Sequence, residues 1–121
     1  MRFELPFPPS VNHYWRHRVI GRHASVYISA DGVDFRREVI KAIHGLGVKL
    51  ENRLNVKIYL YPATLRKFDI DNRVKATLDA LTHAGVWLDD EQIDELTVIR
   101  REKVKGGKMI VEISEIEQKS V

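Results

Sequence analysis

The sequence predicts a single small α+β domain, in which two main helices pack on a small β-sheet. Segments of alternating apolar residues, typical of half-buried strands, lie in the middle and near the end of the chain. Two other segments carry apolar residues at helical spacing. The length of 121 residues corresponds to one domain, and no repeat or interior linker divides it. We therefore treat residues 1–121 as one domain.

The N-terminal part is expected to contain a short strand and a basic loop. Residues 2–6 are predicted to form the strand, which Pro6 ends because proline cannot donate to a strand ladder. Residues 11–25 are predicted to be an irregular loop that carries Tyr14 and Trp15. The two aromatic side chains are interpreted as packing anchors, and stacking on unpaired bases is the alternative.

A helix and a strand are predicted to follow this loop. Ser29 is a suitable N-cap for a helix over residues 30–46. Residues 54–61 alternate between apolar and polar side chains, which predicts a half-buried strand, and Pro62 ends it. The apolar stripe of the helix consists of Phe35, Val39, Ile43 and Leu46.

A second helix is predicted to begin near Asp71, which occupies an N-cap position, and to stop at Gly85. At about 100° per residue, the helix presents an apolar stripe to the core and a polar stripe beside it. The predicted core stripe consists of Val74, Leu78 and Leu81. The predicted polar stripe consists of Asp71, Lys75, Asp79 and Thr82.

The last part of the chain is expected to form two strands, over residues 95–104 and 108–116. Gly106 and Gly107 lie between them, and two adjacent glycines favour the tight turn of a β-hairpin. We therefore expect these strands to pair with each other. The strand order of the whole sheet does not follow from the sequence.

Composition and charge limit the kind of protein this can be. The chain contains no cysteine, which excludes disulfides and thiolate metal sites. Neither a signal peptide nor an apolar run long enough for a membrane span is present, so we expect a cytoplasmic protein. The formal net charge is +3, and basic residues gather in two segments, 16–23 and 100–108. This distribution suits a polyanionic ligand such as nucleic acid.

Acidic residues gather between these basic segments. Asp69 and Asp71 follow a strand, where side chains two residues apart point to one side of an extended backbone. If the helix packs back on the strand, Asp69, Asp71 and one of Asp89 or Asp90 can converge. Such an all-oxygen site favours Mg²⁺, with Mn²⁺ expected to substitute. Lys75 stands one turn after Asp71 and could stabilise negative charge on a phosphate.

These acidic residues also have purely structural interpretations. Asp71 could serve only as a helix cap, and Asp89 and Asp90 could form a solvated turn. Lys75 and Asp79 could be a surface ion pair of small value, because they lie four residues apart on the helix. The spacing alone does not decide between these interpretations and a metal site.

The stretch that contains these acidic residues, 66–94, resembles the core of the RusA family of Holliday-junction resolvases. Residues 69–72 match the family's D-x-D-N motif, and residues 79–90 match its D-A-L…A-G…L-D-D segment. The P-P-S-x-N segment at residues 8–12 is also similar, and the resemblance covers essentially the whole chain. It implies a compact α+β homodimer that cleaves four-way junction DNA. It also implies that three aspartates bind Mg²⁺ and that a helix lysine is needed for cleavage. The corresponding residues here are Asp69, Asp71, Asp90 and Lys75, with Asp89 held second to Asp90.

Four further basic residues are candidates for DNA binding: Arg16, Arg18, Arg66 and Lys67. The first two belong to the N-terminal basic segment. The other two precede the acidic motif, where they could contact the phosphate being cut or only offset the acidic charge. The five histidines show no metal-ligand spacing, and none is assigned a role. Two other functions remain open: a non-catalytic DNA-binding module, and a metal-dependent phosphatase or nucleotide hydrolase. The absence of a glycine-rich phosphate loop argues against the hydrolase.

Overall fold

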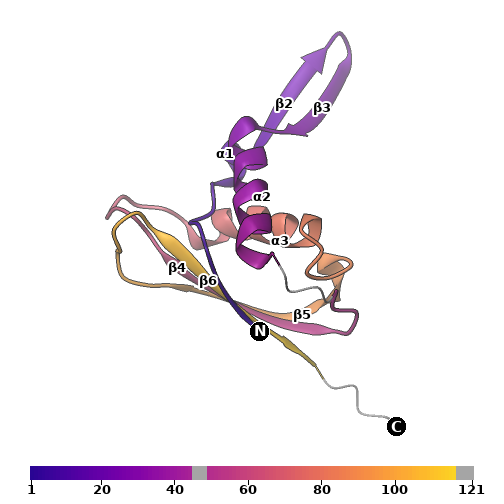
Figure 1. Ribbon diagram of the computed structural model, residues 1–121. Helices are drawn as coiled ribbons and strands as arrows, with labels where there is room; N and C mark the ends of the chain where they lie inside the picture. The colour runs from indigo at the N-terminus through magenta and orange to yellow at the C-terminus, as the bar shows by residue number, and fades with distance from the viewer. Residues whose placement is uncertain (45–48, 117–121) are drawn as a thin grey trace.

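The computed structural model describes residues 1–44 and 49–116. A twisted sheet carries helices on one face, and a two-stranded hairpin projects beyond this body (Figure 1). The elements in chain order are β1 (Arg2–Leu5), α1 (Val11–Tyr14), β2 (Trp15–Ile20), β3 (His23–Ile28), α2 (Ala30–Ile43), β4 (Leu54–Tyr61), the 3₁₀ turn η1 (Ile70–Arg73), α3 (Val74–His83), the 3₁₀ turn η2 (Asp90–Gln92), β5 (Ile93–Arg100) and β6 (Lys108–Glu115). The predicted α+β class and its two main helices are confirmed. None of the described helices is both long and apolar enough to cross a membrane.

The main sheet has the strand order β1-β6-β4-β5. Strand β5 runs parallel to β4, and β6 runs antiparallel to both β4 and β1. The predicted hairpin between the last two strands is therefore wrong, because β5 and β6 pair with opposite edges of β4. The chain crosses the end of β4, where the amides of Arg101 and Val104 donate to the carbonyls of Leu60 and Pro62. Gly106 and Gly107 have positive φ angles and form a turn, as expected, but this turn belongs to the crossing.

The core lies between the sheet and the helices. In β4 every second residue is buried, which confirms the predicted alternation over residues 54–61. Ser29 caps α2 as predicted, because its hydroxyl accepts a hydrogen bond of 3.0 Å from the amide of Gly32. The predicted stripe residues Phe35, Val39 and Ile43 are buried. Leu46 lies outside the described residues.

The start of α3 differs from the prediction. Asp71 is not the N-cap of this helix, because it lies inside the 3₁₀ turn η1 and Arg73 occupies the cap position. The buried residues of α3 are Ala76, Thr77, Ala80 and Leu81. Of the predicted stripe only Leu81 is fully buried. The small side chains of Ala76 and Ala80 face the core, and Val74 and Leu78 lie half-buried at its margin.

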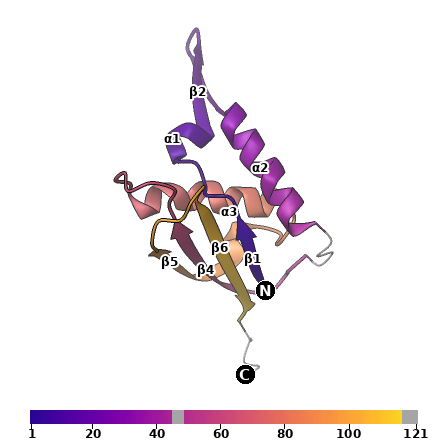
Figure 2. The ribbon, with the colours of Figure 1, turned by 60° about the vertical axis from the view of Figure 1, so that its left-hand side comes forward.

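The predicted irregular loop over residues 11–25 is also wrong. It contains the short helix α1 and most of an antiparallel hairpin, β2–β3, whose turn holds Gly21 at a φ of 61°. The hairpin projects from the body in both views (Figures 1 and 2). Alternation along β2 places Arg16 and Arg18 on one face and His17 and Val19 on the other. Val19, Val26 and Tyr27 favour strands and lie on either side of Gly21, and this pattern is the signal that could have predicted a hairpin.

Candidate active site

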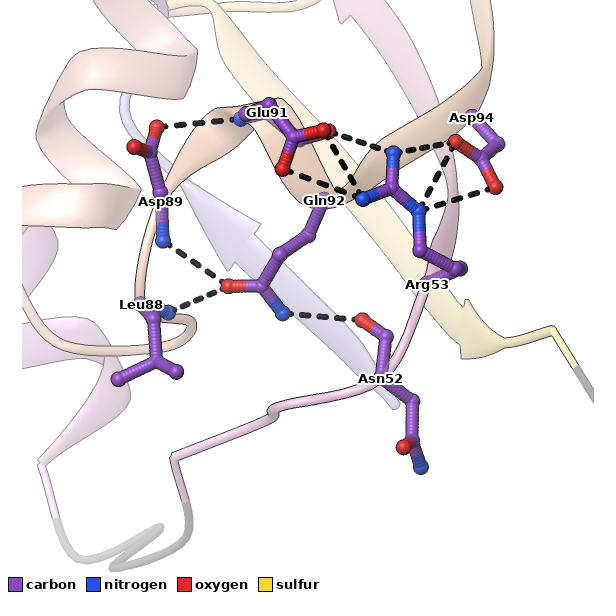
Figure 3. A network of polar contacts seen from close by, with 7 residues as sticks. All are labelled: Asn52, Arg53, Leu88, Asp89, Glu91, Gln92 and Asp94. Carbon is purple, nitrogen blue, oxygen red and sulfur yellow. Dashed lines mark hydrogen bonds and ion pairs between the residues drawn. The ribbon is translucent and has the colours of Figure 1, made fainter.

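The side chain of Gln92 holds the acidic turn of residues 89–90 in place, and Figure 3 shows its hydrogen bonds to Leu88, Asp89 and Asn52. The amide oxygen of Gln92 accepts hydrogen bonds from the backbone amides of Leu88 (2.8 Å) and Asp89 (2.9 Å). Its amide nitrogen donates to the carbonyls of Leu50 (3.1 Å) and Asn52 (2.9 Å). Gln92 is 6% exposed, so these four bonds form largely away from solvent. They fix the turn to the chain segment that leads into β4.

Arg53 fastens the other side of the same turn (Figure 3). Its guanidinium donates to the carboxylate of Glu91 at 3.0 Å and to that of Asp94 at 3.0 Å. The hydrogen bond from Arg53 holds the pKa of Asp94 below its usual value. The two ion pairs are exposed and contribute little stability alone, but together they restrict the path of the backbone through η2.

Asp89 and Asp90 have different roles in this turn. Asp89 caps η2, because its carboxylate accepts a hydrogen bond of 3.1 Å from the amide of Glu91, and this bond lowers its pKa. The pKa of Asp90 is raised, first by burial and then by the neighbouring Asp89 and the charge of Asp79, while Lys75 opposes the rise. Asp89 is thus hydrogen-bonded to the backbone of its own turn, whereas Asp90 is influenced by the charges of two residues of α3, Lys75 and Asp79.

Asp71, Lys75 and Asp90 line one open hollow between α3 and β5. The parallel pairing of β4 and β5 explains this position, because the connection between the two strands carries η1 and α3 and then returns through η2. Most of the surface of the hollow is apolar and comes from Ile70, Val74, Leu78, Leu96 and Val98. The carboxylates of Asp71 and Asp90 and the ammonium of Lys75 therefore line one hollow whose surface is otherwise largely apolar.

Asp69 is not among the residues that line this hollow. It lines a different hollow, together with Arg66, Lys67 and Asn72. The expectation that Asp69 and Asp71 face one point assumed an extended backbone, but η1 begins at Ile70 and turns the chain between them. Among residues 1–44 and 49–116, no group of three or more histidine, aspartate or glutamate side chains is placed to hold a metal ion.

The sequence left open a surface ion pair between Lys75 and Asp79, but Asp79 has a different partner in the structure. Asp79 pairs with Arg36 of α2, whose Nη2 lies 2.6 Å from its carboxylate. Tyr14 donates its hydroxyl to the same carboxylate. Tyr14 is fully buried and Trp15 packs edge-on against it, so the packing interpretation of these aromatics is confirmed.

The candidate DNA-binding residues are exposed in two places. Arg16 and Arg18 lie on the projecting hairpin, where Arg18 stacks over the ring of Tyr27 at 5.1 Å. Arg66 and Lys67 lie in the loop between β4 and η1, at the hollow that contains Asp69.

Three residues of the site were missed by sequence reasoning: Arg36, Gln92 and Arg73. The guanidinium of Arg73 lies over the rings of Phe7 and Phe68, at 5.3 and 5.5 Å from their centroids, and donates to the carbonyl of Pro8. Arg36 and Arg73 bind partners more than 35 residues away in the chain, so no local pattern signals them. Gln92 also completes a capping box with Asp89, and this D-x-x-Q spacing is a local signal that could have found it.

The family model for the endodeoxyribonuclease RusA matches residues 6–114, which includes every element of the site. The chain belongs to the RusA family. The crossover junction endodeoxyribonuclease RusA of Enterobacteria phage HK97 is 41% identical over 118 residues, covering 96% of this chain and 95% of the relative. The relative from Enterobacteria phage 82 is 38% identical, and that from Escherichia coli strain K12 is 36% identical. In both cases 114 residues align, covering 93% of this chain and 92% of the relative.

Proposed function

We propose that this RusA-family protein is a structure-selective, Mg²⁺-dependent endodeoxyribonuclease. Its substrate is four-way junction DNA, which it resolves by paired symmetric nicks in recombination and repair. The observation that carries this proposal is the hollow shared by Asp71, Lys75 and Asp90, in a chain whose relatives are named crossover junction endodeoxyribonucleases.

The donor set at the hollow suits Mg²⁺ or Mn²⁺. Both ions prefer oxygen ligands, and Mg²⁺ is usually held by one or two carboxylates while it keeps several waters. Asp71 and Asp90 supply two carboxylates, and the family resemblance assigns Asp69 to the same set. A bound divalent ion would activate water and neutralise charge on the phosphate being cut. Lys75 would add positive charge beside the phosphoryl oxygens, where negative charge grows in the transition state.

The exposed basic residues would hold the DNA. Arg66 and Lys67 line the hollow that contains Asp69 and would contact the phosphates next to the cleaved bond. Arg16 and Arg18 lie on one face of the projecting hairpin and would contact a DNA arm farther from the cleavage point. Such phosphate contacts position the DNA without reading its sequence.

We also propose that the protein acts as a homodimer. Two symmetric cuts need two active sites related by a two-fold axis. Among the described residues, no strand pairs with the outer edge of β5, and Leu96 on this strand is 43% exposed. Antiparallel pairing of β5 with a second copy, centred on Thr97, would place Leu96 opposite Val98. It would also place Asp94 opposite Arg100, which joins opposite charges.

A mixed dimer tests this assembly. One wild-type subunit paired with one Asp71→Asn subunit should nick a single strand of a cruciform in a supercoiled plasmid, whereas the wild-type dimer should produce linear plasmid. The nick relaxes the supercoil, so the cruciform is lost before a second cut. A wholly inactive mixed dimer would mean that one site is shared between subunits. Linear product from the mixed dimer would mean that the subunits exchange on the DNA, or that an active subunit acts independently of its partner and returns to cut the second strand.

One experiment tests the activity itself. The protein is incubated with labelled four-way junction, linear duplex of the same sequence and a free nucleotide, each with and without Mg²⁺. We expect cleavage of the junction only, and only with Mg²⁺. Junction binding without cleavage would instead support a non-catalytic binding module. Hydrolysis of the nucleotide would support a phosphatase or nucleotide hydrolase.

A further inference from the structure

A partly buried polar network joins α1, α2 and α3 one helical turn from Lys75. The Nη2 of Arg36 lies 2.6 Å from Oδ2 of Asp79, and its Nε lies 3.2 Å from the same oxygen. The hydroxyl of Tyr14 donates to this oxygen as well and accepts a hydrogen bond of 2.8 Å from Nε of Arg36. One carboxylate oxygen of Asp79 is therefore engaged by two partners from other elements.

Burial and charge both stabilise the hydrogen bonds between Tyr14, Arg36 and Asp79. Tyr14 is fully buried, and the side chains of Arg36 and Asp79 are 21% and 29% exposed. Burial and the neighbouring Asp79 raise the pKa of Tyr14, so its hydroxyl stays protonated and remains a donor. Hydrogen bonds to ionised groups away from bulk water are stronger than neutral ones.

The network occupies the Asp79 carboxylate, which could otherwise form an ion pair with Lys75. Lys75 and Asp79 lie four residues apart on α3, the spacing at which opposite charges on a helix attract each other. Lys75 also lines the hollow that Asp71 and Asp90 share. Without its partner on α2, the Asp79 carboxylate would be the natural ion-pair partner of Lys75. It would also add uncompensated negative charge beside Asp71 and Asp90.

We propose that Arg36 is a positioning residue for DNA cleavage, because its ion pair with Asp79 leaves the Lys75 ammonium free to meet the phosphate. This role rests on the proposed nuclease function. Arg36 touches neither DNA nor metal in this role, and it acts only by neutralising Asp79.

A set of variants on α2 and α3 tests the role. Arg36→Gln keeps a hydrogen-bond donor near the position of Nε but removes the charge and the Nη2 contact, and it should slow junction cleavage roughly three- to tenfold at saturating Mg²⁺. Arg36→Lys keeps the charge and should cut nearly as fast as wild type. Arg37→Gln is the matched control, because Arg37 pairs with Asp34 on the exposed side of the same helix, and it should have no effect.

The decisive variant is the double substitution Arg36→Gln with Asp79→Asn. Removing the carboxylate leaves nothing to draw Lys75 aside, so the double variant should recover cleavage to within about twofold of wild type. Calorimetry on the DNA-free protein should give Arg36→Gln an Mg²⁺ affinity no weaker than that of wild type. Thermal unfolding confirms that each variant is folded at the assay temperature.

The outcomes separate the two proposals. If wild type cuts the junction but the double variant stays as slow as Arg36→Gln, Arg36 has only a structural role and the inference is overturned. Weakened Mg²⁺ binding in Arg36→Gln would overturn it too, because the residue would then support the carboxylates. A wild-type protein that fails to cut any junction would overturn the proposed function, and this role with it.

Discussion

The side chain of Gln92 connects the acidic turn to the segment before β4. Its replacement by methionine should destabilise the protein and make the position of Asp90 less fixed. Methionine has a similar length but cannot make the four hydrogen bonds to Leu88, Asp89, Leu50 and Asn52. Each lost bond costs about 1 kcal/mol, and water can reach some of the freed groups, so we expect a loss of about 2–4 kcal/mol in the free energy of unfolding. For a domain of this size that loss lowers the melting temperature by roughly 10 °C.

Urea denaturation followed by circular dichroism measures this loss. Glu95→Gln is the control, because Glu95 is exposed on β5 and its substitution should change stability by less than about 0.5 kcal/mol. At a temperature where Gln92→Met is still folded, we expect slower junction cleavage, since Asp90 is no longer held in place. If Gln92→Met is as stable as the control, the Gln92 side chain does not anchor the turn.

Three further predictions concern individual side chains. Asp90→Asn should abolish cleavage in a gel assay, whereas Asp89→Asn should mainly lower the melting temperature by removing the cap of η2; equal loss of activity would make both residues ligands. Lys75→Ala should cut slowly but bind Mg²⁺ normally by calorimetry, because a protonated lysine is not a ligand; lost Mg²⁺ binding would make its role structural. Replacing Arg16 and Arg18 by alanine should flatten the slope of log affinity against log salt by up to about two units; an unchanged slope would place the hairpin away from DNA.

Local signals predicted the elements whose pattern is set within a few residues. The alternation of β4 and the cap at Ser29 are of this kind, because burial and capping there depend on residues close in sequence. Two glycines at 106–107 correctly predicted a turn. The glycines do not indicate which strands pair with each other. That is decided by the sheet, in which β5 and β6 pair with opposite edges of β4.

The candidate site was predictable as a set of residues but not as a geometry. The D-x-D-N motif and the acidic turn identified Asp71, Lys75 and Asp90, which line one hollow. The position of Asp69 depends on the 3₁₀ turn at η1, which no residue in the motif requires. The ion pair between Arg36 and Asp79 spans 43 residues and exists only because α2 packs against α3.

The assignment of Asp71 to the catalytic site is tested most directly by comparing cleavage and binding in one variant. Asp71→Asn keeps the shape of the side chain and removes its charge. It should therefore bind a four-way junction at least as tightly as wild type but fail to cut it at any Mg²⁺ concentration. Asp31→Asn, on the exposed first turn of α2, is the control and should cut normally. Mg²⁺-dependent cutting by Asp71→Asn at the wild-type rate would contradict the account.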